Sequence, residues 1–156
     1  MWIIGSFVPK LITVFTLGTF HASAVTLFPF VFSRYTPDDT LRAHENTHLR
    51  QSSIFWIIGG LLAAISPWFL LTPMAFSLLY FVFNVIGFLY AAATVKNIPP
   101  QYPRFSVYSY VAWALNPFER DAVAAESDGS ASYIKWITYC RPSNWKLPEH
   151  IAAWRQ

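Results

Sequence analysis

Residues 42–51 read Arg-Ala-His-Glu-Asn-Thr-His-Leu-Arg-Gln, and this stretch decides how the rest of the chain is interpreted. In a helix, His44 and His48 lie one turn apart on the same face. Two imidazoles at this spacing can hold one zinc ion, and Glu45 beside them can take a proton from zinc-bound water. The metal lowers the pKa of that water to about 7, so that hydroxide is available at neutral pH. The stretch therefore predicts a zinc site with Glu45 as the general base.

Two helix starts are signalled in the sequence. The first lies at Asp38 or Asp39, because either carboxylate can accept hydrogen bonds from the free amides of a first helical turn. The second is Asn116-Pro117, because asparagine is favoured at the N-cap and proline at the first helical position. We expect the second helix to cover residues 116–127.

A catalytic zinc ion usually has three protein ligands and one open position, so a third ligand must come from outside residues 42–51. The candidates are His21, His150, Cys140 and the carboxylates of the second helix. Glu119 is favoured among them. The alternative is a capping box, because Glu119 lies three residues after Asn116 and can accept from the backbone amide of that residue.

The composition indicates a membrane. Hydrophobic residues make up 54% of the 156 residues and charged residues only 12%, about half the share of a soluble domain. Residues 51–95 contain no Asp, Glu, Lys or Arg, which is more than one span of about 20 residues needs. The net charge of +3 is spread along the chain without a basic run, so we expect no nucleic-acid partner. The expected partners are membrane lipid and a peptide or protein substrate.

The apolar middle, residues 54–95, predicts a hydrophobic hairpin of two spans that turns at residues 67–73. A hairpin returns the chain to the side it left, so the two metal helices can share one site. Basic residues flank both ends of the apolar middle, which favours the inner membrane with the site on the cytoplasmic face. Residues 1–24 imitate a secretory signal imperfectly and favour a strand or an interfacial element instead. A cleaved signal would reverse the orientation.

Residues 24–33 are rich in β-branched and aromatic residues and contain Pro29. A proline inside a strand favours an edge position, because it cannot donate to a neighbouring strand. An edge strand near the metal helix can bind an extended peptide through main-chain hydrogen bonds, and Thr26, Leu27 and Phe28 are the residues expected to do so. A buried strand without this role is the alternative.

Glu119-Arg120-Asp121-Ala122 matches Glu-x-x-Ala, the second motif of the gluzincin-type metallopeptidases, which the chain resembles. The chain is more closely similar to a set of small bacterial and phage proteins. These proteins have a Thr-x-x-Pro-Phe strand, His-Glu-x-x-His-x-x-Gln, a hydrophobic middle and Phe-Glu-Arg-Glu-Ala, and the counterparts here are residues 26–30, 44–51 and 118–122. The resemblance covers roughly residues 25–126. It implies that the zinc ligands are His44, His48 and Glu119, with Glu45 as the base.

Two positions depart from the motifs of these relatives. Asp121 stands where the small proteins have glutamate. Val123 stands where gluzincins with Glu-x-x-Ala-Asp have an aspartate that orients a histidine ligand.

Tyr108 and Tyr110 are candidates for stabilising an oxyanion, with packing at the membrane interface as the alternative.

The sequence as a whole predicts a mainly α (α+β) fold in one domain of residues 1–156. It combines a zincin-like helix pair, a small edge-strand sheet and a hydrophobic transmembrane helical hairpin, followed by a tail at residues 131–156. The first functional hypothesis is a membrane-associated zinc metallopeptidase. The second is a catalytically silent membrane or virion protein in which zinc braces the helix pair.

Overall fold

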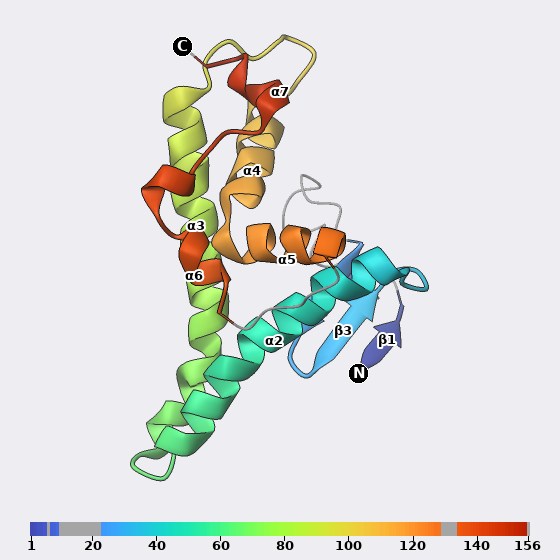
Figure 1. Ribbon diagram of the computed structural model, residues 1–156, viewed down its shortest axis with the longest axis vertical. Coiled ribbons are helices and arrows are strands. Elements are labelled where there is room, and N and C mark those ends of the chain that lie inside the picture. Colours follow the sequence, from blue (N-terminus) through green and yellow to red (C-terminus); the bar gives the residue numbers. More distant parts are fainter. Residues whose placement is uncertain (6, 10–22, 129–133, 156) are drawn as a thin grey trace.

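The computed structural model describes residues 1–5, 7–9, 23–128 and 134–155, and in this part the protein is mainly helical with a small sheet (Figure 1). This confirms the predicted α+β class. His21 and most of the possible signal region lie outside the described residues. The elements in chain order are β1 (Trp2–Ile4), β2 (Ala24–Leu27), β3 (Phe30–Ser33), α2 (Asp39–Leu62), the 3-10 helix η1 (Pro67–Leu71), α3 (Thr72–Thr94), α4 (Arg104–Leu115), α5 (Pro117–Asp128), α6 (Trp136–Tyr139), the 3-10 helix η2 (Pro142–Asn144) and α7 (Glu149–Ala152).

The three strands form one sheet in the order β1-β3-β2, with β1 parallel and β2 antiparallel to β3. The prediction of a single strand over residues 24–33 is wrong. Pro29 follows a cis peptide bond and lies in the turn between β2 and β3, where its missing N–H costs no ladder hydrogen bond. The prediction of an edge is confirmed for β2, which pairs with β3 alone among the described strands.

Helix α2 begins at the predicted cap and continues well past the histidines. The Asp38 carboxylate accepts a hydrogen bond of 2.8 Å from the backbone N–H of Leu41. The helix then runs through His44 and His48 without interruption to Leu62. One rigid element therefore carries both the metal-binding motif and the first part of the apolar middle.

Of the two predicted membrane spans, the part of the chain that the structure describes contains one helix with the length and composition of a span. Within the described residues, a single helical stretch, Pro67–Thr94, is long and apolar enough to cross a membrane. The part of α2 that follows Arg50 ends at Leu62, so it reaches only roughly 18 Å at 1.5 Å per residue. This is short of the about 30 Å of a hydrocarbon core. The two apolar segments still form a hairpin, because η1 turns the chain back and α3 packs against α2.

Helices α3 and α4 form the main hydrophobic core together with the end of the chain. The buried residues of this core are Ala91, Val95, Val107, Val111, Leu115 and Ile151. The tail docks there through hydrogen bonds from the backbone N–H groups of Lys96 and Asn97 to the carbonyl of Trp154. Gly87 lets the two helices approach closely, because a Cβ atom added there would lie 2.9 Å from the Cα of Ala112.

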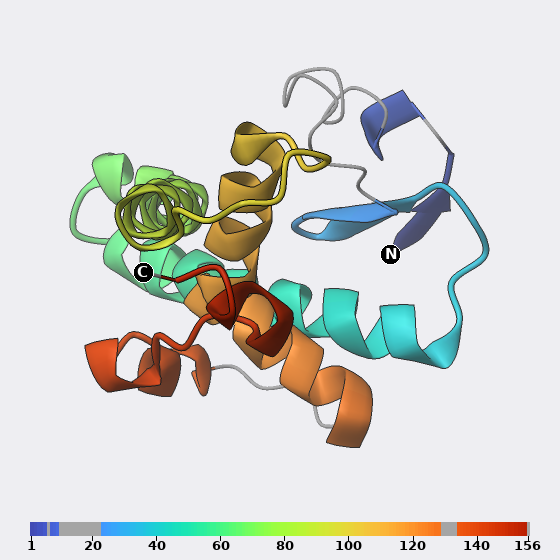
Figure 2. The same ribbon diagram turned by 90° about the horizontal axis from the view of Figure 1, so that it is seen from above.

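Helix α5 follows α4 after the single residue Asn116 and crosses the middle of the molecule (Figure 1). The side chain of Asn116 accepts from the backbone N–H of Phe118 at 3.1 Å, as predicted for an N-cap. Seen from above, the sheet and α5 lie on different sides of the N-terminal half of α2 (Figure 2). Helix α2 is therefore the element that both the sheet and the second metal-ligand helix pack against.

The close approach of α3 and α4 gives a test of the fold. Gly87→Val places a branched side chain against the backbone of Ala112, and overpacking of this kind costs about 1–3 kcal/mol. Gly60→Val is the matched control, since a Cβ atom at Gly60 meets nothing within 4 Å. Its effect is expected to stay within about 0.5 kcal/mol. Unfolding of the two variants in detergent solution measures the difference, and equal stabilities would contradict the packing described.

Candidate metal centre

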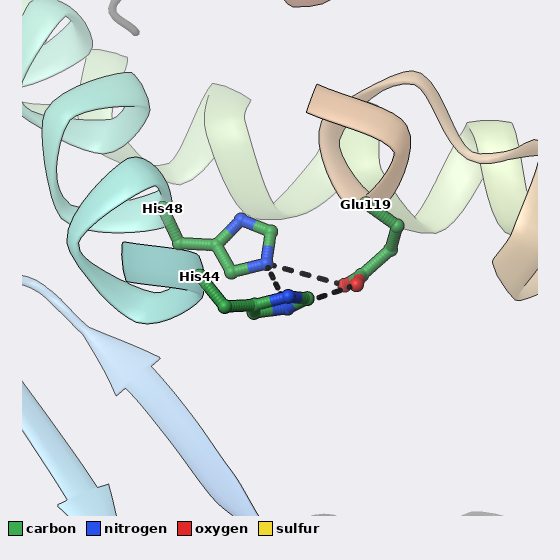
Figure 3. A group of neighbouring side chains, drawn as sticks. All are labelled: His44, His48 and Glu119. Carbon is green, nitrogen blue, oxygen red and sulfur yellow. Dashed lines mark hydrogen bonds and ion pairs between the residues drawn. The ribbon is translucent and has the colours of Figure 1, made fainter. Parts of the chain in front are cut away.

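Three side chains from two helices converge on one point. His44 and His48 come from α2 and Glu119 from α5, and their ligand atoms all lie within 4.8 Å of one another (Figure 3). The two Nε2 atoms are 3.2 Å apart, and the carboxylate oxygens of Glu119 lie 3.3 Å from Nε2 of His44 and 3.4 Å from Nε2 of His48. His48 and Glu119 are buried, and the side chain of His44 is 12% exposed. This cluster can hold one metal ion.

The position of Glu119 is set by its neighbour in the chain. Phe118 is completely buried, and its ring packs between those of Phe76, Tyr80, Phe83 and Trp136. This anchor holds the first turn of α5 against α3 and α6. The capping-box alternative is not formed, because the backbone N–H of Asn116 donates to the carbonyls of Ala112 and Trp113. The carboxylate of Glu119 is therefore free to face the histidines.

Each histidine is oriented by a hydrogen bond from its other ring nitrogen. Nδ1 of His44 lies 2.7 Å from Oε1 of Glu126, and Nδ1 of His48 lies 3.0 Å from Oε1 of Gln51. Both partners present oxygen atoms that accept, so both Nδ1 atoms carry the hydrogen. In the neutral rings the lone pairs are then on the Nε2 atoms, which face the shared point. Contacts of this kind fix the tautomer and the ring orientation of histidine ligands in metal sites.

The structure shows the surroundings of Asp121 and Val123, the two residues that depart from the quoted motifs. Val123 is 41% exposed and has no role at the cluster, but Glu126, one turn further along α5, supplies the orienting carboxylate for His44. Asp121 accepts a hydrogen bond of 3.0 Å from the amide of Gln51, and this bond turns the oxygen of Gln51 towards His48. The sequence analysis assigned no role to Glu126 or to Gln51, although Gln51 ends the motif quoted there. Helical spacing could have found both, since they lie seven and three residues after ligands on the same faces.

A tyrosine from the apolar hairpin contacts the third ligand. The hydroxyl of Tyr80 in α3 donates a hydrogen bond of 2.5 Å to Oε1 of Glu119. Tyr108 and Tyr110 lie elsewhere: the ring of Tyr108 packs against Phe88, and that of Tyr110 packs against Trp113 and His150. The printed contacts of Tyr108 and Tyr110, the predicted candidates for stabilising an oxyanion, do not include a residue of the cluster. No local signal in the sequence marks Tyr80.

Glu45 lies at the sheet side of the histidines. It is 5% exposed, and its Oε2 atom accepts a hydrogen bond of 2.5 Å from the hydroxyl of Thr26 in β2. This bond fixes the carboxylate and leaves Oε1 as its other oxygen. The Glu45 charge also contributes to raising the pKa of His44 and of His48, so it lies within electrostatic reach of both rings.

Among the described strands, β2 pairs with β3 alone, and its Thr26 side chain contacts Glu45. The N–H of Arg34 donates to the carbonyl of Ser23. This bond sets which residue pairs between β2 and β3 exchange main-chain hydrogen bonds and which do not. By that alternation, the main-chain groups of Ala24 and Thr26 point away from β3. Leu27 ends the strand, and Phe28 lies in the turn with its ring 5.6 Å from that of Trp56.

The other candidate ligands in the described residues are not part of the cluster. His150 lies in α7 against the ring of Tyr110, and the thiol of Cys140 donates to the carbonyl of Trp136 at 3.7 Å. Burial raises the pKa of the Cys140 thiol. The cluster found in this part of the chain thus has three ligands, and the favoured residue, Glu119, is one of them.

The buried carboxylate controls the charge of the cluster. Burial alone would lower the pKa of His48, but the field of Glu119 and the hydrogen bond to it outweigh burial and raise this pKa to about 9. Burial also lowers the pKa of His44, but its hydrogen bond to Glu119 and the charges of Glu119 and Glu45 together outweigh burial and raise it. Burial alone would raise the pKa of Glu119, and the two imidazoles instead hold it well below its usual range. Without metal, protons therefore lie between the same Nε2 atoms and carboxylate oxygens that would bind the ion.

Comparisons with protein-family models, with curated proteins and with solved structures found no match to this chain. The resemblance to gluzincin-type metallopeptidases therefore stays a prediction from the motifs.

Proton competition gives a test of metal binding. A metal ion needs the neutral imidazole of His48, whose raised pKa of about 9 means that the metal-free ring is protonated at neutral pH. Affinity should therefore fall about tenfold for each pH unit below 9, with about one proton released per ion bound near pH 7.5. Calorimetric titration in buffers of different ionisation enthalpy measures both quantities. Binding that does not change between pH 7 and 9 would contradict the assignment of His48.

Removal of an orienting carboxylate gives a second test. Glu126→Ala leaves Nδ1 of His44 without its acceptor, and loss of such a contact typically weakens metal binding 10- to 100-fold. Glu126→Gln keeps an accepting oxygen and should lie between this variant and the wild type. Glu149→Ala in α7 is the control, because it removes an exposed carboxylate outside the cluster. Equal affinity of Glu126→Ala and the control would rule out the role of Glu126.

Proposed function

We propose that the protein is a zinc-dependent metallopeptidase. The observation that carries the proposal is the combination of a three-ligand cluster with Glu45, which is held beside it by Thr26 and is not one of the converging ligands. Catalytic zinc sites have three protein ligands and an open position, whereas structural sites usually have four protein ligands. Three ligands converge within the described residues, and this number supports a site of the first kind.

The ligand types in the cluster support zinc over magnesium and calcium, and the spacing is compatible with it. Zinc bonds of about 2.0–2.1 Å at tetrahedral angles place neighbouring ligand atoms about 3.3–3.4 Å apart. The two Nε2 atoms are 3.2 Å apart, and Oε2 of Glu119 lies 3.3 Å from Nε2 of His44. Two imidazoles and one carboxylate also suit zinc, whereas magnesium and calcium prefer oxygen ligands. His44, His48 and Glu119 would hold the ion.

The chemistry is hydrolysis of a peptide bond. Bound zinc lowers the pKa of a coordinated water molecule to about 7 and polarises a carbonyl group. Glu45 takes a proton at Oε1 while the hydroxyl of Thr26 holds Oε2. The same carboxyl group then delivers that proton to the leaving amine. Tyr80 holds Glu119 through Oε1, which leaves Oε2 as the oxygen for the metal.

The substrate is an extended peptide that pairs with the edge of β2. The main-chain groups of Ala24 and Thr26 are directed to this edge, and antiparallel or parallel addition of a strand uses such groups. Because the side chain of Thr26 contacts Glu45, a peptide bound here has its backbone next to the catalytic carboxylate. Leu27 continues the predicted substrate strand, and Phe28 borders it from the turn.

A second candidate function is a structural zinc brace without catalysis. The observation in its favour is that the ligands are largely buried and join α2 to α5, two helices far apart in the sequence. In that case chelation of the metal would lower the melting temperature, and no peptide would be cleaved by the wild-type protein.

Glu45→Gln separates the two functions. We expect this variant to keep one zinc ion per chain and to lose about 10²- to 10⁴-fold in peptide hydrolysis, because only the proton acceptor is removed. Metal analysis and cleavage of a fluorogenic peptide library measure the two properties. Glu149→Gln, an exposed change in α7, is the control for activity. Unchanged hydrolysis by Glu45→Gln would disprove Glu45 as the base.

Glu119→Ala is the companion variant in the same experiment. It removes the oxygen ligands, so the zinc content of the purified protein should fall below one per chain. A content that stays at one per chain would show that Glu119 is not a ligand.

A further inference from the structure

The far end of the molecule is an apolar hairpin tip, defined here as residues 54–79. It comprises the last part of α2, η1 and the beginning of α3 (Figure 1). No residue from 51 to 95 is charged. The exposed large apolar side chains of the tip are Trp56, Ile57, Ile58, Leu61, Ile65, Trp68, Phe69, Leu70, Leu71, Met74 and Leu78. A contiguous apolar surface of this kind is not stable in water and marks an interaction with lipid or protein.

The metal centre limits how deeply α3 can enter a bilayer. Tyr80 lies in the first half of α3 and contacts Glu119, and the side chain of Asn116 donates to the carbonyl of Tyr80 at 3.2 Å. The buried cluster therefore lies at the height of Tyr80 along α3. A complete crossing by α3 would place the cluster within the hydrocarbon. It would also bring the exposed charges of Arg42 and Glu126 into lipid, which is unfavourable.

The length of the tip matches one leaflet. Residues 54–62 of α2 extend roughly 14 Å, and residues 72–79 of α3 extend roughly 12 Å, at 1.5 Å per residue. Half of a hydrocarbon core of about 30 Å is about 15 Å. The part of the hairpin beyond the metal centre is thus long enough to reach the middle of a bilayer and too short to cross it.

The backbone of the turn suits a lipid environment, where unpaired N–H groups are costly. The N–H of Ala63 donates to the carbonyl of Gly59, those of Ile65 and Ser66 donate to the carbonyl of Leu62, and that of Phe69 donates to the carbonyl of Ser66. Pro67 and Pro73 have no N–H group. Gly59 permits this tight return, because a Cβ atom there would lie 2.8 Å from the carbonyl oxygen of Phe69.

We propose that the hairpin tip inserts into one leaflet of a lipid bilayer and that the metal centre lies at the membrane surface. Arg50 is exposed one turn before the tip on α2, at the height where anionic headgroups meet the protein. The competing arrangement is a full crossing, because the outer face of α3 remains apolar as far as Leu89. Insertion of the tip does not require catalysis, so the vesicle measurements below can fail while the proposed function stands.

Depth measurements with spin labels distinguish the two arrangements. The full chain with Cys140→Ser serves as the background, and single cysteines replace Ile65 at the tip, Val85 beyond the metal centre and Leu89 near the end of α3. In vesicles of phosphatidylcholine and phosphatidylglycerol, one-leaflet insertion places the label at residue 65 deepest. The labels at 85 and 89 then remain accessible to a water-soluble quencher. A deepest label at residue 85, with residue 65 accessible at the far surface, would overturn the proposal.

Vesicle binding gives an independent readout. Ile65→Asp places a charge at the deepest point and should weaken partition into the same vesicles on the order of a hundredfold, whereas the control Leu89→Asp should leave it nearly unchanged. Equal loss in both variants would overturn one-leaflet insertion. A protein that does not bind vesicles and is a stable dimer without detergent would also overturn it, because a second copy would then cover the tip.

Discussion

The structure depends on one buried carboxylate. Glu119 lies between the imidazoles of His44 and His48, and burial of such a charge is unfavourable unless opposite charges and hydrogen bonds surround it. The hydroxyl of Tyr80 supplies one of these bonds, and the anchor of Phe118 keeps the carboxylate in place. Helices α2, α3 and α5 therefore meet where they do because each contributes a group to the same small volume.

The two halves of helix α2 lie in different surroundings. Its N-terminal half carries the polar cluster and packs against the sheet, while its C-terminal half is apolar and exposed. The change occurs within about two turns after His48, which is why the polar centre and the apolar tip are adjacent and still distinct. A helix that changes character along its length, and not around its circumference, is typical of a protein that meets a boundary between two solvents.

Local sequence patterns predicted the helix starts and the three side chains that converge in the cluster, whereas contacts between distant segments could not be predicted. The cap at Asp38, the start at Pro117 and the convergence of His44, His48 and Glu119 follow from spacing and from motif resemblance. The contact of Tyr80 with Glu119 could not be predicted. It depends on how α4 brings α5 back to the first half of α3. The strand pairing around Pro29 was missed because a proline signals an edge and a turn equally well.

The order of the ligands along the chain has a consequence for biosynthesis. The two histidines precede the apolar hairpin and Glu119 follows it, so the third ligand is synthesised only after residues 67–94 have been made. A nascent chain that ends before α5 has two imidazoles and no carboxylate between them. The complete cluster therefore forms only after the hairpin has turned back and α4 has docked, and an ion bound by all three side chains would stabilise that completed state by mass action. Such an ion would favour chains whose apolar segment is already in place.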